Sequence, residues 1–416
     1  MHLAIDLGAT SGRMLVGTTR DFQEVFRFSY EIQKKQDRLY WPLDEILDTL
    51  VKGIRLAKSQ FPISSVGVDS WAVDYVDLAI PGEMRCYRDP ANASASEKLH
   101  ERLGIDHLFL ANGLQYLPFT TVYQLYRSWS ESKGRRQEPL LLPDYINYFF
   151  TGVKFAEITN ASTTGLVDPV TRTWNQELIE QLPFRLTLPG LIEPGTAVGY
   201  GRGEFSDLRF IAVASHDTAS AFVGAELAAD EVLISSGTWS LLGVELSAPN
   251  TSEQARVSGF SNELGHNQTT RFLKNLNGMW VLEQLRQKWG LSQSEVHELI
   301  EQAAEVPAQS VVDLNIPSLM SPGDLEALLE GLYGDSVTRV VLVRRVLDSL
   351  AHSYLEVISQ LEQVLQLEYS TIKVVGGGSN NKTLLGILRA KTSKKITVGS
   401  TEATGLGNLM LQQQYS

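Results

Sequence analysis

The stretch LAIDLGATSGRMLVG (residues 3–17) decides the fold of this chain. It reads as an apolar strand, a turn of glycine and small hydroxyl residues, and a second apolar strand. Residues of these types allow several backbone N–H groups to converge on one anion. A second stretch of the same kind, EVLISSGTWSLLGV (residues 231–244), lies near the middle of the chain. The repeat predicts two domains that each present one hairpin to the same polyphosphate.

Neither turn matches the common phosphate-binding loops. A Walker A loop needs the pattern G-x-x-x-x-G-K-[ST], and a dinucleotide fingerprint needs G-x-G-x-x-G at the start of a helix. Here a strand follows each turn, so an ordinary tight turn stays the alternative for either hairpin taken alone. Asp6 ends the first strand, and its carboxylate suits a Mg²⁺ ion held through water.

Composition narrows the class of protein. The 416 residues suit two domains, and a hydrophobic content of 43% is enough for sizeable cores. A net charge of −12 without a long basic run argues against a nucleic-acid partner. Cys86 is the only cysteine, which excludes an intrachain disulfide. With no signal peptide and no apolar run of membrane-spanning length, we expect a cytoplasmic enzyme without a membrane partner.

Strands and helices alternate in both halves of the sequence, which predicts an α/β fold in each half. The domain boundary is expected after the small-residue helix that follows Asp217, giving domains 1–224 and 225–416. Buried strands are predicted at 65–69, 210–214 and 372–375, and helices at 43–58, 271–289, 340–367 and 402–413.

Asp217 stands where the strand 210–214 meets the start of a helix. Ligands of open α/β sheets bind at the carboxyl ends of strands. One interpretation is an N-cap, whose carboxylate accepts a hydrogen bond from the first helical N–H groups. The other is a general base that removes the proton of a substrate hydroxyl as it attacks the γ-phosphate of ATP. The two roles are compatible, and His216 is either a sugar contact or a buried structural histidine.

A third glycine-rich turn, GGGSN (residues 376–380), follows a buried strand. Three glycines without side chains would let a flat ring approach the backbone, while a flexible strand-to-helix turn is the alternative. Trp71, Trp239 and Trp280 fit packing roles better than stacking platforms.

These segments resemble the FGGY carbohydrate kinases, and among them the rhamnulokinases most closely. The resemblance extends over essentially the whole chain. Its most specific segments are VDSWAVDY (68–75), SHDTAS (215–220), SSGTWS (235–240) and GGGSN (376–380).

The resemblance implies an actin-like fold, with two ribonuclease-H-like domains around a central cleft. It implies ATP-dependent phosphorylation of a ketose hydroxyl, in rhamnulokinases O1 of L-rhamnulose. Asp217 would be the base, and the sugar would contact Ala72, His216, Asp217 and Thr218. The nucleotide would contact Ala9, Thr10, Ser11, Gly12, Arg13, Gly237, Thr238, Asn275, Glu283, Gly377 and Gly378.

Three substitutions depart from the pattern of the rhamnulokinases. Ala72 stands where they usually carry glycine, Ala91 where they carry arginine, and Glu283 where they carry glutamine. A shortened C-terminus is also expected. Alternatives therefore stay open: a kinase for another ketose or polyol, such as L-fuculose, ribulose or xylulose, or an actin-like nucleotide-binding regulator without sugar turnover.

Overall fold

The computed structural model describes residues 1–132, 134–319 and 324–415. The chain packs into two compact units. The first comprises Met1–Gly224, Glu245–Phe272 and Ala403–Ser416, and the second Ala225–Val244 and Leu273–Glu402. The expected domains 1–224 and 225–416 stay a prediction, because packing units and family domains need not coincide.

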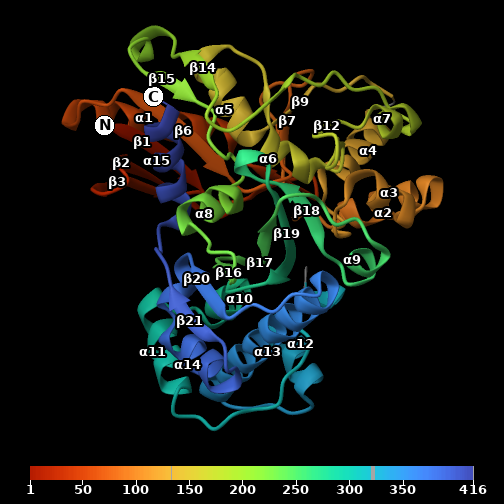
Figure 1. The fold of residues 1–416 in the computed structure, drawn as a ribbon, viewed down its shortest axis with the longest axis vertical. Helices are drawn as coiled ribbons and strands as arrows, with labels where there is room; N and C mark the ends of the chain where they lie inside the picture. Colours follow the sequence, from red (N-terminus) through yellow and green to blue (C-terminus); the bar gives the residue numbers. More distant parts are fainter. Residues whose placement is uncertain (133, 320–323, 416) are drawn as a thin grey trace. The chain divides into compact units, whose positions relative to one another are not determined.

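The first sheet lies in the first unit and contains the predicted N-terminal hairpin. Strands β15, β6 and β1 are parallel, whereas β2 and β3 continue antiparallel from β1. Every residue of β6 is buried, as expected for a parallel strand inside a sheet. The strand order is β14 (Ala197–Tyr200), β15 (Arg209–Ile211), β6 (Ser65–Ser70), β1 (His2–Leu7), β2 (Ser11–Gly17) and β3 (Phe22–Ser29) (Figure 1).

The second sheet repeats this plan around the second predicted hairpin. Strand β16 pairs antiparallel with β17 on one side and parallel with β20 on the other, and β21 continues parallel to β20. The strand order is β18 (Ser261–Leu264), β19 (Thr270–Asn277), β17 (Trp239–Leu246), β16 (Glu231–Ser236), β20 (Thr371–Val375) and β21 (Lys395–Val398). The mixed α/β class is thereby confirmed, and five strands follow the same order in the two sheets: β15, β6, β1, β2 and β3 in the first, and β21, β20, β16, β17 and β19 in the second.

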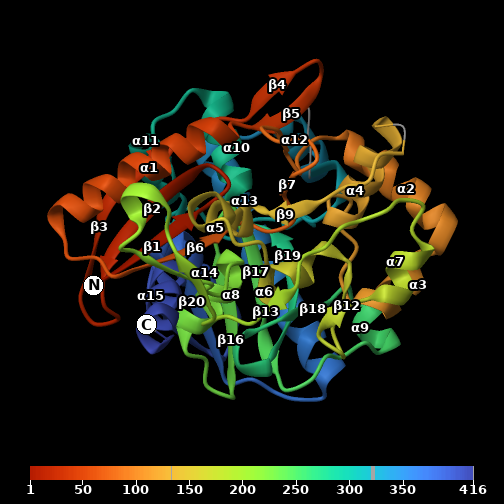
Figure 2. The same cartoon turned by 90° about the horizontal axis from the view of Figure 1, so that it is seen from above.

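Two helices show how the first sheet is covered. Helix α1 (Leu43–Gln60) packs against β3 (Figure 2) and carries acids in its first turn and Lys58 in its last, which suits the helix dipole. Helix α15 (Ala403–Tyr415) comes last in the chain yet packs against β1 and β6 (Figure 1).

The remaining helices include short ones of one or two turns. They are α2 (Ala91–Leu103), α3 (Ile105–Asn112), α4 (Thr121–Glu131), α5 (Leu142–Thr151), α6 (Ile158–Ala161), α7 (Gln176–Gln181), α8 (Asp217–Ala225), α9 (Glu253–Val257), α10 (Trp280–Trp289), α11 (Gln293–Ala303), α12 (Leu325–Tyr333), α13 (Arg339–Leu365) and α14 (Lys382–Lys391). None of the described helices is long and apolar enough to cross a membrane.

Short strands form small sheets outside the two main ones. They are β4 (Gln33–Lys35), β5 (Arg38–Trp41), β7 (Tyr75–Asp77), β8 (Met84–Arg85), β9 (Pro139–Leu141), β10 (Ala156–Glu157), β11 (Val167–Asp168), β12 (Thr173–Trp174) and β13 (Leu191–Ile192).

The helix predicted at 271–289 is wrong over its first half. Residues Thr270–Asn277 form strand β19, and helix α10 begins only at Trp280. The apolar spacing of Phe272, Leu273 and Leu276 suits a helix as well as a buried strand, so sheet pairing decided the outcome. Gly278 lies between the two elements, and a Cβ there would lie 2.7 Å from Oγ of Ser240, so a side chain does not fit at this position.

Candidate active site

The carboxyl ends of neighbouring parallel strands bring three aspartates together in the first unit. Asp6 on β1 is the register partner of Asp69 on β6. The backbone N–H of Ser70 donates to the Ser215 carbonyl at 2.9 Å, and Ser70 forms a bridge with His216. The next residue is Asp217, so this edge of the sheet gathers the predicted metal-binding and catalytic carboxylates.

The two oxygens of the Asp217 carboxylate differ in their partners. Oδ1 accepts the backbone N–H of Thr218 at 2.6 Å and its hydroxyl at 3.1 Å, and lies 3.3 Å from Nε2 of His216. No residue of the described chain donates to Oδ2, and the side chain is 31% exposed. An N-cap of the usual kind is excluded, because the carboxylate bonds the adjacent amide rather than one two or three residues later.

Two opposing influences act on the pKa of Asp217. Desolvation by the surrounding protein raises the pKa, and the negative charge of Asp6 raises it further. His216 and the hydrogen bonds from Thr218 lower it, but the net direction is upward. A carboxylate with a raised pKa accepts a proton more readily than a solvated one, as a general base requires.

Asp6 is paired with a predicted phosphate ligand. It is the register partner of Arg13 across the hairpin, and the Arg13 Nη2 and Nε atoms lie 2.7 and 2.8 Å from Oδ2 of Asp6. At the turn itself, Thr10 is exposed and Ala9 and Ser11 are half-buried, so their backbone is within reach of a ligand. Gly12 also has a packing role, because a Cβ there would lie 2.5 Å from the ring of Phe28.

Ala72 lies in a strained turn supported by a buried carboxylate. Val73 has φ of +68°, which is rare for a β-branched residue and marks stored strain. Below it, Asp74 accepts hydrogen bonds from Trp71 at 3.0 Å, from Gln124 at 3.1 Å and from the indole of Trp41. Burial raises the pKa of Asp74 to about 6, although these hydrogen bonds lower it. The structure thus gives Trp71 the packing role expected from the sequence.

The second unit brings several predicted nucleotide contacts together around its hairpin. The carbonyls of Gly237 and Thr238 accept the backbone N–H groups of Met279 and Trp280 at 3.0 and 3.1 Å, which anchors the start of α10 at the turn. Glu283 lies one helical turn further along α10, where its carboxylate pairs with Arg286 at 2.7 Å.

The glycine-rich turn packs on the same hairpin. A Cβ on Gly378 would lie 2.0 Å from Oγ of Ser236, and one on Gly376 would lie 2.9 Å from the Ser236 carbonyl oxygen. A Cβ on Gly377 would meet nothing within 4 Å, so this glycine borders open space. Asn275 lies on β19, in the same sheet but on a strand separated from β16 by β17.

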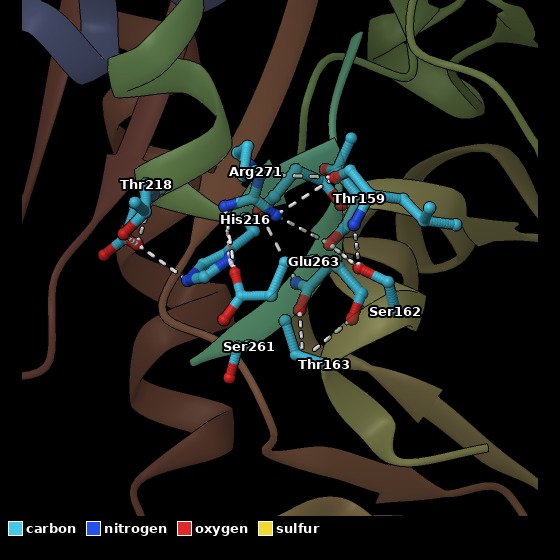
Figure 3. A network of polar contacts seen from close by, with 12 residues as sticks. Thr159, Ser162, Thr163, His216, Thr218, Ser261, Glu263 and Arg271 are labelled. Carbon is cyan, nitrogen blue, oxygen red and sulfur yellow. Dashed lines mark hydrogen bonds and ion pairs between the residues drawn. The ribbon is translucent and has the colours of Figure 1, made fainter. Parts of the chain in front are cut away.

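Sequence reasoning missed the buried charges that hold the His216–Asp217 turn in place. Oε2 of Glu157 accepts the N–H and the hydroxyl of Ser215 at 2.9 and 2.7 Å. Glu263 and Arg271 lie beside His216 and are 4% and 0% exposed (Figure 3). The sequence carried little signal for these residues, because Glu263 and Arg271 belong to strands that also hold other polar residues, SNEL and TRFLKNLN.

Comparison with known proteins assigns the class. The sequence model of the FGGY family of carbohydrate kinases, N-terminal domain, matches residues 1–224, and that of the C-terminal domain matches residues 232–413. The chain belongs to the FGGY family of carbohydrate kinases. It is therefore a phosphotransferase that acts on the hydroxyl of a small-molecule sugar, and the expected enzyme class is confirmed.

Within that family the chain is similar to rhamnulokinases. It is 32% identical to the rhamnulokinase of Halalkalibacterium halodurans, with 99% of this chain and 92% of the relative covered. It is 34% identical to that of Enterococcus faecalis (99% and 88%) and 33% identical to that of Bacillus subtilis (99% and 90%).

Solved structures agree on the fold. A ligand-bound xylulose kinase from Lactobacillus acidophilus superimposes with a TM-score of 0.81 at 16% identity, covering all of this chain and 89% of the other. Plasmodium falciparum glycerol kinase with ADP gives 0.75 at 16% identity, covering 99% and 89%. The predicted actin-like ATPase fold is confirmed.

Proposed function

We propose that this chain transfers the γ-phosphoryl group of ATP to O1 of L-rhamnulose. Three rhamnulokinases from different organisms align over 99% of the chain at 32–34% identity, which supports this sugar above other ketoses. The single observation that carries the mechanism is the Asp217 carboxylate, which has one oxygen held by protein donors and the other without a protein partner among the described residues.

In this proposal Oδ2 of Asp217 receives the proton of the O1 hydroxyl as that oxygen attacks the γ-phosphorus. The bond from phosphorus to the bridging oxygen breaks, and ADP leaves with the electron pair. Oδ1 stays fixed by Thr218, so the base needs no reorientation during the reaction. Ala72, His216 and Thr218 would contact the sugar.

The phosphates would be held by backbone N–H groups of the two hairpin turns. In the first unit these belong to residues 9–12, with Arg13 alongside, and in the second to Gly237 and Thr238. Asn275, Glu283, Gly377 and Gly378 would border the nucleotide. Gly377 supports this assignment best, because open space lies where its side chain would be.

A Mg²⁺ ion fits the first turn only through water. Among the residues the structure describes, no group of three histidine, cysteine or acidic side chains could cage a metal. Asp6 alone suffices for an ion that keeps most of its waters and takes one or two carboxylates. When bound, the ion would neutralise charge on the transferred phosphoryl group.

The test measures sugar-dependent ADP formation over a panel of ketoses with wild-type protein and with Asp217→Asn. We expect turnover with L-rhamnulose, and a loss of about 10²–10⁴-fold in kcat in Asp217→Asn. Asp37→Asn, which changes an exposed carboxylate on a surface turn, serves as the matched control and should keep full activity. A folded Asp217→Asn protein with near-normal kcat would remove Asp217 from the role of base.

The same panel tests the sugar. A higher kcat/KM for L-fuculose, ribulose or xylulose than for L-rhamnulose would reassign the substrate and leave the kinase chemistry in place. Nucleotide binding without turnover of any ketose would contradict this catalytic proposal.

A further inference from the structure

His216 lies beside the buried ion pair of Glu263 and Arg271 (Figure 3), and its ring also contacts the proposed base, Asp217. On one side of its ring, Nδ1 lies 3.2 Å from Nη1 of Arg271 and 3.2 Å from Oε2 of Glu263. On the other side, Nε2 lies 3.3 Å from Oδ1 of Asp217. A neutral imidazole carries one proton, so either Nδ1 or Nε2 donates, and the choice decides what His216 does for Asp217.

Arg271 has no freedom to turn away from His216. Its Nε and Nη2 atoms both donate to the Leu264 carbonyl at 3.2 and 3.1 Å, and Nη2 also donates to the Thr159 carbonyl at 3.2 Å. These carbonyls belong to β18 and α6, and they fix the guanidinium on two sides. The remaining Nη1 therefore points at His216.

The contacts of Nη1 favour one tautomer of His216. A guanidinium always donates and never accepts, so a proton on Nδ1 would face the N–H of Arg271. The Arg271 N–H has hydrogen-bond geometry toward Nδ1, and Glu263 lies 3.0 Å from the same Nη1, where it compensates the charge of the buried arginine. Nδ1 is thus the acceptor, and the ring proton belongs on Nε2, which faces Asp217.

We propose that Arg271, paired with Glu263, holds His216 in the Nε2–H tautomer, so that His216 orients the Asp217 carboxylate and keeps its charge. Arg271 and Glu263 are positioning residues in this scheme. The inference depends on the proposed role of Asp217 as the base. It assigns Oδ1 to the Thr218 donors and to the 3.3 Å contact with Nε2 of His216, and leaves Oδ2 for the sugar hydroxyl.

The opposite tautomer would give His216 a different role in catalysis. With a proton on Nδ1 donated to Glu263, the bare Nε2 could itself take the substrate proton, as the histidine of a catalytic triad does. The two schemes differ in an observable of the resting protein, the position of one hydrogen.

The first experiment reads that hydrogen directly. Protein with ¹⁵N-labelled histidine is examined by two-dimensional ¹H–¹⁵N spectroscopy at neutral pH without substrate, and the His216 signals are assigned by their loss in His216→Gln or, if that variant fails to fold, in His216→Asn. We expect a protonated Nε2 and an unprotonated Nδ1. A proton on Nδ1, or on both nitrogens, overturns the proposal even if Asp217→Asn abolishes turnover.

The second experiment uses a pair of variants that differ in one donor. The amide nitrogen of His216→Gln occupies a place close to Nε2 and still donates, whereas His216→Leu removes the donor. A hydrogen bond to a charged group is worth about 1.5–3 kcal/mol, so the Gln variant should keep about ten- to a hundred-fold more kcat than the Leu variant. Equal losses in kcat in both would overturn the proposal, while a loss confined to KM would restrict His216 to binding the sugar and equally overturn it.

The pH dependence of kcat provides a third test, because the proposal fixes the direction in which its acid limb should move. A donor aimed at a carboxylate favours its charged form, so removing that donor should move the acid limb of kcat to higher pH in His216→Leu and less in His216→Gln. Glu301→Gln, which breaks an exposed glutamate–histidine pair on α11, is the matched control and should leave the limb in place. The other charged and titratable groups that face this site are the same in all variants: Asp6, Arg13, Tyr30, Asp69, Glu157, Glu245, Glu263 and Arg271.

Discussion

At the scale of single residues, this chain places ionisable groups where water barely reaches. Asp69 is fully buried, with Oδ2 accepting a hydrogen bond from Asn408 at 2.6 Å and Oδ1 lacking a partner in the described chain. Burial, and then the charge of Asp6, raises the pKa of Asp69 well above its usual value. Such perturbed carboxyl groups cluster at functional sites, which agrees with the position of Asp69 beside Asp6 and Asp217.

Ala72 offers a residue-scale prediction about specificity. Its methyl group should narrow the sugar site, and one carbon in a pocket is worth about 1–3 kcal/mol. Ala72→Gly should therefore raise kcat/KM for L-rhamnulose relative to smaller pentuloses by roughly ten-fold or more. Steady-state kinetics on both sugars provide the measurement, with Ala79→Gly in an exposed turn as the control. If the ratio between the two sugars does not change, Ala72 does not set specificity.

Glu283 supports a second prediction at this scale. Its carboxylate pairs with Arg286 and accepts hydrogen bonds from Gln287 at 3.0 Å and Gln293 at 3.2 Å. Glu283→Gln removes one negative charge and frees the Arg286 guanidinium, which should tighten ATP binding by a few-fold because the pair is partly solvated. Calorimetric titration with ATP at low and high salt should show the larger gain at low salt. An affinity that is the same as wild type at both salts would mean that Glu283 points away from the nucleotide.

At the scale of elements, helices α8 and α15 approach each other through glycine. A Cβ on Gly407 would lie 1.9 Å from the Ser220 carbonyl oxygen, and one on Gly224 would lie 2.1 Å from the Ala403 carbonyl oxygen. Both obstacles are backbone atoms, which cannot move aside as a flexible side chain can. Helix α8 begins at Asp217, so this contact supports the position of the proposed base as well as the packing of the first unit.

Gly407→Ala should consequently destabilise the first unit. Overpacking of this kind costs about 1–3 kcal/mol in the free energy of unfolding, and kcat should fall because α8 must shift. Gly386→Ala in α14 is the matched control, since a Cβ there meets nothing within 4 Å and helix propensity favours alanine by up to about 1 kcal/mol. Urea unfolding should show a lower free energy of unfolding than wild type for Gly407→Ala and a higher one for Gly386→Ala. A stabilised Gly407→Ala protein would show that the two helices are not in this contact.

At the scale of the whole molecule, buried carboxyl groups should make stability depend on pH. The pKa of Asp74 is about 6 in the folded protein and near 3.8 when exposed, so the folded state binds its proton more tightly. The stability that this group contributes is present in full below about pH 4 and is lost as the pH rises to about 6. The pKa values of Asp69 and Asp144 are also raised by burial, and they act in the same direction.

Asp74→Asn isolates the part due to this one group. A rise of about two pKa units corresponds to about 3 kcal/mol, so the unfolding free energy of wild type relative to Asp74→Asn should fall by about that amount between pH 4 and pH 7. Urea unfolding followed by tryptophan fluorescence is suitable, because Trp41 and Trp71 donate directly to Asp74. In Asp37→Asn, an exposed control, the difference should stay flat, and a flat difference in Asp74→Asn as well would mean that its folded pKa is not raised.

The sequence by itself determined the two hairpins, the α/β class and the kinase family. These depend on local patterns: apolar strands that flank glycine and hydroxyl turns, and motifs such as SHDTAS that are contiguous in the chain. It also pointed to Asp217 through its position at a strand end. Between residues 271 and 289 the local pattern was ambiguous, and the helix predicted there proved half strand.

Only the tertiary structure decided what surrounds Asp217. Glu157, Glu263 and Arg271 come from three different strands. The bond between Glu157 and Ser215 spans 58 residues of sequence, and that between Arg271 and His216 spans 55. Asn408 reaches Asp69 across 339 residues. No local pattern encodes such pairs, because the free energy that favours a buried charge comes from a partner that folding alone brings within reach.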